Sequence, residues 1–327
     1  MISVLGECVA DAFAGRASGE DARSGAGQRG GQGGGDPELA LRVLPGGGPA
    51  NTAVALARLG TPTRFLGRIS RDVFGGLFRD RLAASGVDVS GCVDAAEPST
   101  LAVASLDARG QAAYSFHAEG AADWRWTAGE LAAAGLGGSS CLHTGSLALV
   151  REPGREAVLR FAAEAAARAT VSIDPNVRPG LAPREAYDVP RWCAFADIVK
   201  LSADDLAFLA PGAAAEHACD AWHAAGARLV VVTRGAAGAL VSLDGSRAQV
   251  AAPRVGVVDT VGAGDAFTAG LLHRLGERGL LGGRLDRLDL DTAADAAAFA
   301  ARVAALTCAV AGANPPWAYQ LTEPAPS

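Results

Sequence analysis

The second half of the chain alternates short apolar runs with Ala-rich stretches, and this alternation restricts the possible folds more than any other feature. Four of the runs read as buried strands: Cys141 to Thr144, Val171 to Asp174, Ile198 to Leu201 and Leu229 to Thr233. Ala-rich segments such as Glu156 to Arg168 lie between them and read as helices. Strands and helices in alternation predict a parallel sheet that is covered by helices on both faces, which is an α/β fold.

Further elements are predicted before and after this alternating part, and those in the first third of the chain are more antiparallel. The strands are Ile2 to Gly6 and Arg64 to Ile69, and the hairpins are Thr100 to His117 and Ala239 to Leu243 with Arg247 to Ala251. The helices are Ala50 to Leu59, Val73 to Ala84, Ala263 to Leu275 and Thr292 to Val310. The loop-rich first third suggests a small β appendage on a doubly wound core.

The segment from Ser18 to Gly35 consists almost entirely of Gly, Ser, Gln, Arg and acidic residues. A composition so poor in apolar side chains cannot compensate the entropy lost on ordering. We therefore expect a flexible Gly-rich insertion at 18–35.

Composition and charge narrow the function classes. Half of the 327 residues are hydrophobic, which is enough for a large core, and the net charge of −6 offers no basic field for a nucleic acid. The first apolar run has no Lys or Arg before it, and the longest uncharged stretch is broken by Pro315 and Pro316, so neither a secretory signal nor a membrane span is expected. The six cysteines form no CxxC pair and read as reduced thiols. These features favour a cytoplasmic enzyme that acts on small molecules.

Lys200 is the only lysine among 29 basic residues. Its neighbours Val199 and Leu201 exclude the GxxxxGK[ST] phosphate loop, so any bound nucleotide has its phosphates held in another way. Codon bias toward arginine explains the composition without any function for Lys200, and both interpretations stay open here.

Two glycine clusters precede helices and could hold an anion. In the segment Val258 to Phe267, read as a strand end, a turn and a helix start, Gly262, Ala263 and Gly264 would let backbone N–H groups approach an anion. Asp265 in this turn is either a helix cap or a catalytic base. The GxGxxG dinucleotide fingerprint fails because Phe267 occupies its third glycine position, which disfavours a dehydrogenase. The second cluster, Gly46 to Asn51, reads as a tight turn into a helix or as a ligand loop.

These clusters and two further motifs resemble the ribokinase-like carbohydrate kinases of the phosphofructokinase-B family. The matching segments, in a resemblance that runs from Ile2 to about Leu321, are Gly46 to Gly60 (GGGPANTAVALARLG), Gly67 to Gly75 (GRISRDVFG), Asp174 to Pro179 (DPNVRP) and Asp259 to Phe267 (DTVGAGDAF). The resemblance implies one carbohydrate kinase domain over 1–327, with a ribokinase-like three-layer αβα Rossmann-like core. It also implies a small β-sheet lid, from parts of about 10–48 and 92–122, and transfer of the ATP γ-phosphoryl group to a sugar hydroxyl.

The resemblance also implies roles for individual residues. Asp265 corresponds to the base, and the backbone of Gly262, Ala263, Gly264 and Asp265 corresponds to the anion hole of the family. Asp11 and Asn51, with the backbone of Gly47 and Gly48, correspond to groups that hydrogen-bond sugar hydroxyls. Arg178 is either a partner for a carboxylate or phosphate of the substrate or the partner of a neighbouring protein carboxylate.

For the nucleotide, the resemblance points to ATP held by the loop that contains Thr233, Gly235 and Gly238, by Lys200 and by Asn314. Magnesium would lie near Asp205 through water, although the family's Asn-x-x-Glu pattern is replaced here by Ser202-Ala203-Asp204-Asp205. Asp259 and the following Thr260 match positions that line a monovalent-cation site in some members of the family. K⁺ would be the cation at such a site. A purely structural role at the end of a strand would satisfy this pair equally well.

The sugar is expected to be neutral. The sequences GGGPAN and Tyr114 to Trp126 resemble bacterial fructokinases, and kinases of 2-keto-3-deoxygluconate usually carry an Arg where this chain has His117-Ala118-Glu119. Glu119, if it faced inward, would repel a substrate carboxylate. Fructose is therefore the first candidate, with 2-keto-3-deoxygluconate and ribose as alternatives and a non-catalytic sugar sensor as the rival from another class. A homodimer through the lid is also expected.

Overall fold

The computed structural model describes residues 1–15, 39–106 and 112–321, so the insertion predicted at 18–35 lies outside the described residues. Its main sheet has eight strands in the order β14-β13-β12-β11-β10-β9-β1-β4. All neighbouring pairs from β12 to β4 are parallel, whereas β13 and β14 form an antiparallel edge. The strands are β1 (Ile2–Leu5), β4 (Thr63–Leu66), β9 (Cys141–Gly145), β10 (Thr170–Asp174), β11 (Ile198–Ser202), β12 (Leu229–Thr233), β13 (Ala239–Leu243) and β14 (Ser246–Val250).

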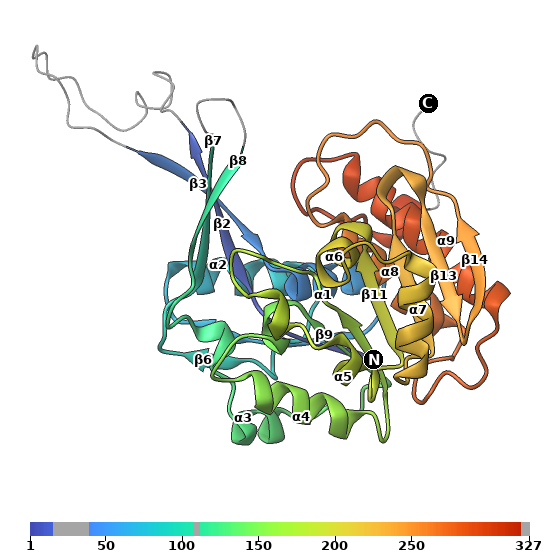
Figure 1. Ribbon diagram of the computed structural model, residues 1–327. Coiled ribbons are helices and arrows are strands. Elements are labelled where there is room, and N and C mark those ends of the chain that lie inside the picture. The colour runs from blue at the N-terminus through green and yellow to red at the C-terminus, as the bar shows by residue number, and fades with distance from the viewer. Residues whose placement is uncertain (16–38, 107–111, 322–327) are drawn as a thin grey trace, which may run out of the picture.

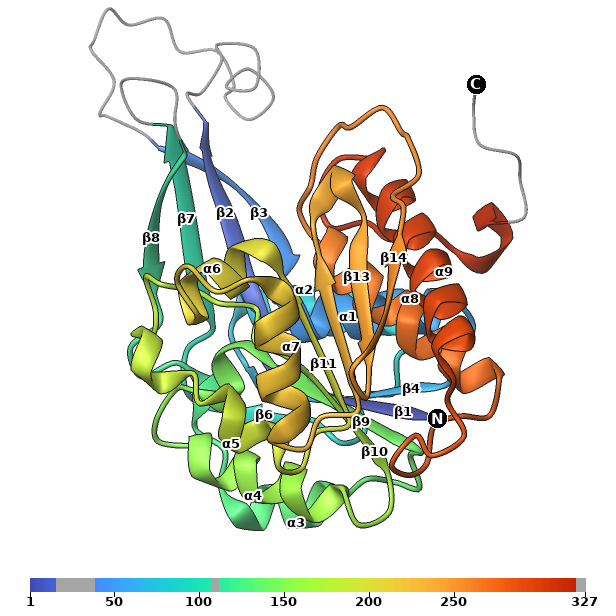
Figure 2. The ribbon, with the colours of Figure 1, turned by 45° about the vertical axis from the view of Figure 1, so that its right-hand side comes forward.

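Helices cover both faces of this sheet, and Figures 1 and 2 show the three layers. One face packs on α1 (Gly48–Arg58), α2 (Val73–Ala84), α8 (Ala263–Glu277) and α9 (Leu290–Cys308), around a core that includes Val4, Ile198 and Val231. The opposite face packs on α3 (Ala128–Ala134), α4 (Arg155–Ala165), α5 (Val189–Cys193), α6 (Ala203–Leu209) and α7 (Ala215–Ala224). Alternate residues of each strand supply the two cores, since successive side chains of a strand point to opposite faces.

A second sheet of four strands stands beside the main one, in the order β3-β2-β7-β8. It consists of β2 (Val9–Gly15), β3 (Ala40–Gly46), β7 (Thr100–Leu106) and β8 (Ala112–His117), and it rises on the left of Figure 1. Because β2 follows β1 and β3 leads directly into α1, this sheet is attached at the edge where β1 ends. A short pair, β5 (Arg68–Ser70) with β6 (Val93–Ala95), lies near its base.

Two predictions of local structure are wrong. The strand predicted from Arg64 to Ile69 is interrupted at Gly67: β4 pairs with β1, whereas β5 pairs with β6 in a different sheet. The strand predicted to end at Val258 is absent, because the backbone of Val258 and Asp259 bonds to the Cys308 carbonyl at the end of α9 and not to a sheet. Asp11 lies within β2.

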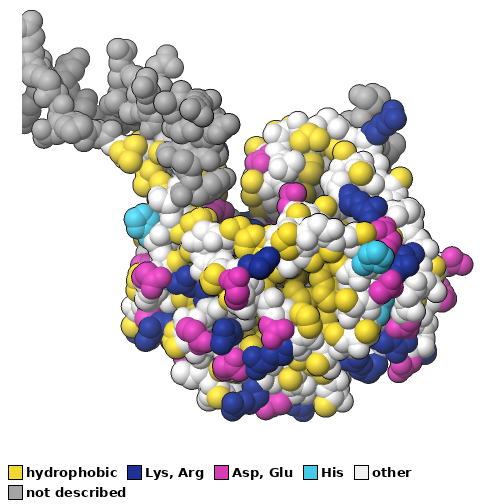
Figure 3. Space-filling view, viewed as in Figure 1, with side chains coloured by type: hydrophobic (Ala, Val, Ile, Leu, Met, Phe, Trp, Pro, Cys, Tyr) yellow, Lys and Arg dark blue, Asp and Glu magenta, His cyan; other side chains and the backbone are white. Residues whose placement is uncertain are grey.

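The surface carries charges of both signs. Figure 3 shows Lys and Arg side chains interspersed with Asp and Glu on the face in view. Over residues 1–15, 39–106 and 112–321, no helix combines the length and apolarity needed to cross a bilayer.

Candidate active site

Polar residues from distant parts of the sequence meet where the parallel strands of the main sheet end. Asp174 is the last residue of β10, Ser202 the last of β11 and Thr233 the last of β12. The first turns of α1 and α8 face the same edge, so that Asn51 contacts Asp265 across 214 positions of sequence. The carboxyl edge of an open parallel sheet is where ligands bind in α/β folds.

Asp265 lies in the first turn of α8 and is held from α1. The Asn51 Nδ2 group donates to its Oδ2 at 2.9 Å, and the Thr52 hydroxyl donates to its backbone carbonyl at 3.4 Å. Burial raises the pKa of Asp265, whereas the Asn51 hydrogen bond and the charge of Lys200 lower it. The Oδ1 of Asn51 is buried without a hydrogen-bond partner in the described residues. An unfilled acceptor beside a carboxylate is suited to receive a hydroxyl group.

Asp11 and the glycines that precede α1 form the adjoining wall. A Cβ atom on Gly46 would lie 2.0 Å from Asp11 Oδ2, so the carboxylate rests on this backbone. A Cβ atom on Gly48 would lie 2.3 Å from Asn176 Nδ2 and 3.2 Å from Asp265 Oδ1. Burial raises the pKa of Asp11 to about 6, and the charge of Asp265 also raises it. The predicted sugar contacts at Asp11, Gly48 and Asn51 are thus brought together around Asp265.

Gly47 has a backbone role in this wall. Its φ of +100° is in the region that favours glycine, and a Cβ atom there would lie 2.5 Å from the Glu7 carbonyl oxygen. Any larger residue would therefore move the turn that carries Gly48.

A small recess lies beneath this wall, partly open to solvent. Its lining is Gly48, Pro49, Thr52, His143, Gly145, Ser146, Asp174, Asn176 and Asp265. Ser146 and Asn176 have positive φ values of 53° and 40°, a strain that is concentrated at functional sites. Burial and the charge of Lys200 lower the pKa of His143 to about 3, so its imidazole is neutral beside these carboxylates.

The glycine turn before α8 is shaped to receive an anion. Gly262 caps the helix with φ of +77°, and a Cβ atom there would lie 2.6 Å from the Ala313 side chain, so only glycine fits. The first turn of a helix leaves its N–H groups without intrahelical partners and carries a partial positive charge. In this turn the Ala263 N–H bonds to the Thr260 carbonyl at 3.2 Å, which leaves the amides of Gly264 and Asp265 as the better placed donors.

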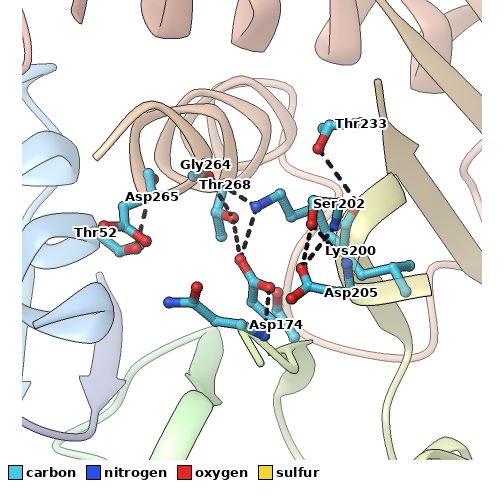
Figure 4. Close-up of polar contacts among 12 residues, drawn as sticks. Thr52, Asp174, Lys200, Ser202, Asp205, Thr233, Gly264, Asp265 and Thr268 are labelled. Carbon is cyan, nitrogen blue, oxygen red and sulfur yellow. Dashed lines mark hydrogen bonds and ion pairs between the residues drawn. The ribbon is translucent and has the colours of Figure 1, made fainter. Parts of the chain in front are cut away.

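Lys200 lies inward of this turn (Figure 4). Its ammonium donates to Asp174 Oδ2 at 2.7 Å and to the Gly264 carbonyl at 2.9 Å, and only 3% of the residue is exposed. The Thr268 hydroxyl lies 3.4 and 3.1 Å from the same two acceptors, and its single proton can bond to either of them. Burial raises the pKa of Asp174 to about 6 against the lowering effect of Lys200. The predicted contact of Lys200 with nucleotide phosphates stays a prediction.

The side chains of Asp205 and Arg178 both form hydrogen bonds with nearby backbone groups. Asp205 Oδ2 accepts from the backbone and hydroxyl of Ser202 in a capping box, and Oδ1 accepts from the Val177 N–H at 2.8 Å. Arg178 is exposed and donates to the carbonyls of Asn176 and Val177. Its charge nevertheless lowers the pKa of Asp11 and of Asp265.

The remaining predicted nucleotide residues lie on the side of β12. Thr233 donates to the Leu201 carbonyl, Gly235 has φ of +54°, and a Cβ atom on Gly238 would lie 1.9 Å from the Val250 carbonyl oxygen. The Oδ1 of Asn314 accepts from Arg58, in the last turn of α1, at 2.6 Å. Asp259 accepts the N–H groups of Val261 and Gly312, one on each carboxylate oxygen. In the described residues, no three His, Cys, Asp or Glu side chains are grouped as metal ligands.

Glu119 does not face inward. Its carboxylate is 95% exposed and pairs with Arg151 at 2.9 Å, whereas the neighbouring Ala118 is buried. The turn after β8 directs the Glu119 side chain to solvent, so the repulsion considered from the sequence does not occur.

Sequence reasoning missed several residues of the site. Thr52, His143 and Asn176 line the recess, and Arg81 of α2 donates to the carbonyls of Pro45 and Ala313, between the two glycine clusters. A histidine inside the otherwise apolar strand Cys141–Gly145 was a signal for His143. Arg81 gave none, because an arginine in an amphipathic helix is ordinarily exposed.

Comparison with known proteins agrees with this geometry. Residues 36–318 match the family described as pfkB family carbohydrate kinase. A fructokinase of Rhizobium leguminosarum bv. trifolii is 40% identical over 243 residues, which cover 73% of each chain. The structure of a Xylella fastidiosa fructokinase with bound ATP superposes with a TM-score of 0.81 at 29% identity, over 95% of this chain and 93% of that one.

A Vibrio cholerae O395 fructokinase double mutant, in the fructose, ADP and potassium ion bound form, superposes with a TM-score of 0.76 at 29% identity, over 95% and 93% of the two chains. The family resemblance and the ribokinase-like α/β fold expected from the sequence are both confirmed. This chain belongs to the pfkB family of carbohydrate kinases.

Proposed function

We propose that this carbohydrate kinase transfers the γ-phosphoryl group of ATP to a hydroxyl of fructose. The observation that carries the proposal is the placement of Asp265, which lies between a polar wall suited to a sugar and a helix N-terminus suited to a phosphate. Phosphoryl transfer requires alignment of acceptor and donor and stabilisation of charge on the transferred group. The fructokinase relatives support fructose as the acceptor.

In the proposed mechanism the sugar oxygen attacks the γ-phosphorus while the bond to the β,γ-bridging oxygen breaks. The hydroxyl proton passes to the Asp265 carboxylate, which Asn51 orients. The amides of Gly264 and Asp265 stabilise the negative charge on the transferred group without rearrangement. Asp11, the free Oδ1 of Asn51 and the backbone at Gly47 and Gly48 hold the remaining hydroxyls.

For the nucleotide, we propose that magnesium enters as part of the MgATP substrate, with Asp205 near its water shell. Exposed apolar side chains lie next to the glycine turn and would pack against the adenine base: Val257, Val258, Val261 and Val310. The predicted nucleotide contacts remain those of Thr233, Gly235, Gly238 and Asn314.

Potassium would bind at Asp259, whose two oxygens each retain one lone pair after accepting a backbone amide. Replacing K⁺ by choline should then lower turnover.

The test is a coupled assay of ADP formation over a panel of fructose, ribose and 2-keto-3-deoxygluconate. We expect kcat/KM for fructose to exceed that for 2-keto-3-deoxygluconate by at least about 10²-fold, since a buried carboxylate without a cation is strongly disfavoured. Arg178 and Arg81 are both cations whose charge acts on Asp11, and Arg178 is the exposed one of the two. An Arg178→Gln variant tests whether Arg178 could reverse this preference. Preference for the keto acid would exclude fructose while leaving the kinase activity intact.

The rival function, a sugar sensor without catalysis, predicts a different result. Sugar would then raise the melting temperature of the protein while no ADP forms with any sugar of the panel. Because Asp265 and the glycine turn are both in place, we expect turnover.

Two further proposals concern the surroundings of the enzyme. We place it in the cytoplasm, where ATP is available and where the six cysteines, all free in the structure, stay reduced. We also propose a homodimer through the four-stranded sheet, which would act as the lid of the sugar site.

A further inference from the structure

We propose that Lys200 is a positioning residue, whose ammonium fixes the first turn of α8 to β10 and β11 and thereby aims the phosphate-binding amides. This inference rests on the proposed kinase function and gives Lys200 a role other than contact with the nucleotide. Lys200 is buried, and two of its N–H groups bond to Asp174 Oδ2 and to the Gly264 carbonyl. Figure 4 shows the side chain reaching from β11 to the base of the glycine turn.

The contact with Gly264 orients one peptide unit. The carbonyl of Gly264 and the N–H of Asp265 belong to the same planar trans peptide, so they point in opposite directions. With the carbonyl held inward at 2.9 Å from the ammonium, the Asp265 N–H is directed outward, toward the position of the transferred phosphoryl group. The hydrogen bond from the ammonium, which is shorter than the 3.1 Å contact of Thr268 with the same carbonyl, therefore helps to fix the direction of this donor.

The charge of Lys200 acts on the base as well. It lowers the pKa of Asp265, which burial raises, and so favours the ionised carboxylate that accepts the proton. The ammonium forms an ion pair with Asp174, and its charge also acts on Asp265.

The site also explains why this basic residue is a lysine in a chain that otherwise uses arginine. A Cβ atom on Gly264 would lie 3.1 Å from Nζ, so the space around the ammonium is already narrow. A guanidinium is larger, planar and carries five donors, more than the acceptors found here can satisfy. Codon bias accounts for the missing lysines elsewhere but not for the one retained at position 200.

The first test is Lys200→Met, which keeps the length of the side chain and removes its charge. We expect kcat to fall about 10²-fold, with KM for fructose and for MgATP changed less than about threefold. The acidic limb of the kcat profile should move to higher pH, because the pKa of Asp265 rises. Unchanged kcat with a KM for MgATP raised more than about tenfold, and no shift of the pH profile, would show direct nucleotide contact and overturn the proposal.

Thr268→Val is the matched control. The Thr268 hydroxyl can bond to either of the same two acceptors but is uncharged, so kcat should stay within about threefold of wild type and the pH profile should not move. A loss equal to that of Lys200→Met would show that any missing bond in the cluster disables the site, and would contradict a specific role for the ammonium.

Lys200→Met leaves the Asp174 carboxylate buried without its partner. The double variant Lys200→Met/Asp174→Asn removes both charges, so its melting temperature should be closer to that of the wild type than the melting temperature of Lys200→Met is. We expect its kcat to stay low, since the Gly264 carbonyl has lost its anchor. Recovery to near wild-type kcat would mean that Lys200 only neutralises Asp174.

The third measurement needs neither variants nor turnover, so it separates this inference from the proposed function. Protein labelled with ¹³C,¹⁵N-lysine gives one side-chain Cε–Nζ correlation, because the chain has one lysine. The ammonium protons should be protected from solvent exchange before any nucleotide is added. An ammonium that exchanges freely and becomes protected only with MgADP would overturn the proposal. If the wild-type enzyme instead phosphorylates no sugar, the proposed function fails on its own.

Discussion

Asp265 lies between the wall proposed to bind the sugar and the glycine turn proposed to bind the phosphate. Asn51 and Lys200 stabilise its negative charge. Asp265→Asn keeps the shape and the hydrogen bond with Asn51 but removes the basic oxygen pair. We therefore expect kcat to fall by about 10²-fold or more. The melting temperature should change little, because no charge that supports the fold is removed. Near wild-type turnover of this variant, measured by the coupled assay, would refute the assignment of Asp265 as the base.

Glu7 makes stability depend on pH. Only 2% of the residue is exposed, and burial raises the pKa of its carboxyl from 4.5 to about 7. Between these values the folded chain holds a proton that the unfolded chain releases, so the stabilising effect is complete below pH 4.5 and is lost as the pH rises to 7. The free energy of unfolding of Glu7→Gln relative to wild type should thus rise by about 3 kcal/mol between pH 4 and pH 8.

Denaturant unfolding of both proteins at the two pH values measures this difference, and the other titrating groups cancel between them. A constant difference would mean that Glu7 ionises normally in the fold. The buried Glu7 Oε2 has no hydrogen-bond partner in the described residues, which is the structural reason for expecting the shift.

At the residue scale, the sequence predicted which residues belong to the candidate site better than it predicted which contacts they make. Asp265, Asn51 and Gly262 follow from motifs because glycine turns at helix starts have few uses. The inward position of Lys200 and the outward position of Glu119 depend on packing between segments far apart in sequence, which no local pattern contains.

The helix α2 contains two adjacent glycines with opposite structural demands. A Cβ atom on Gly75 would lie 1.8 Å from the Ser70 carbonyl oxygen, whereas one on Gly76 would meet nothing within 4 Å. Gly76→Ala should stabilise the protein by about 0.5–1 kcal/mol, because alanine loses less backbone entropy in a helix. Gly75→Ala should destabilise it, because the backbone of Ser70 must move. Melting curves of the two variants give the signs, and equal effects would contradict the close packing of α2 on β5.

Elements with strong periodicity were predicted closely and elements set by tertiary partners were not. The helix Val73–Ala84 and the strand Leu229–Thr233 agree with the sequence to the residue, since a capping Asp72 and a run of branched side chains mark them. The run from Arg64 to Ile69 contains no turn signal other than Gly67, and pairing with β1 on one side and β6 on the other divides it there. The segment before Gly262 is extended without a sheet because α9 supplies its hydrogen-bond acceptor.

Over the whole molecule, the candidate active site is assembled from the ends of β10, β11 and β12, the first turns of α1 and α8, and Asp11 of β2. The general rule for parallel sheets predicted which edge would carry it, and the motifs predicted which turns. What the rule could not supply is the relative placement of α1 and α8, which brings Asn51 to 2.9 Å from Asp265. That distance follows from the packing of both helices on one face of the sheet.

Among the described residues, β3 is an edge strand of the four-stranded sheet, and we expect a second copy of the chain to cover this edge. Leu39 is 69% exposed and Leu41 is 42% exposed, and β3 is a seven-residue strand at the end of its sheet. Long apolar edges promote pairing with another chain, and an uncovered one would favour aggregation. Analytical ultracentrifugation of the full chain at micromolar concentration should therefore show a dimer. Leu41→Asp should shift it to monomer, whereas Val73→Asp, on the exposed face of α2, should leave it dimeric. A wild-type chain that sediments as a soluble monomer would show that β3 needs no partner.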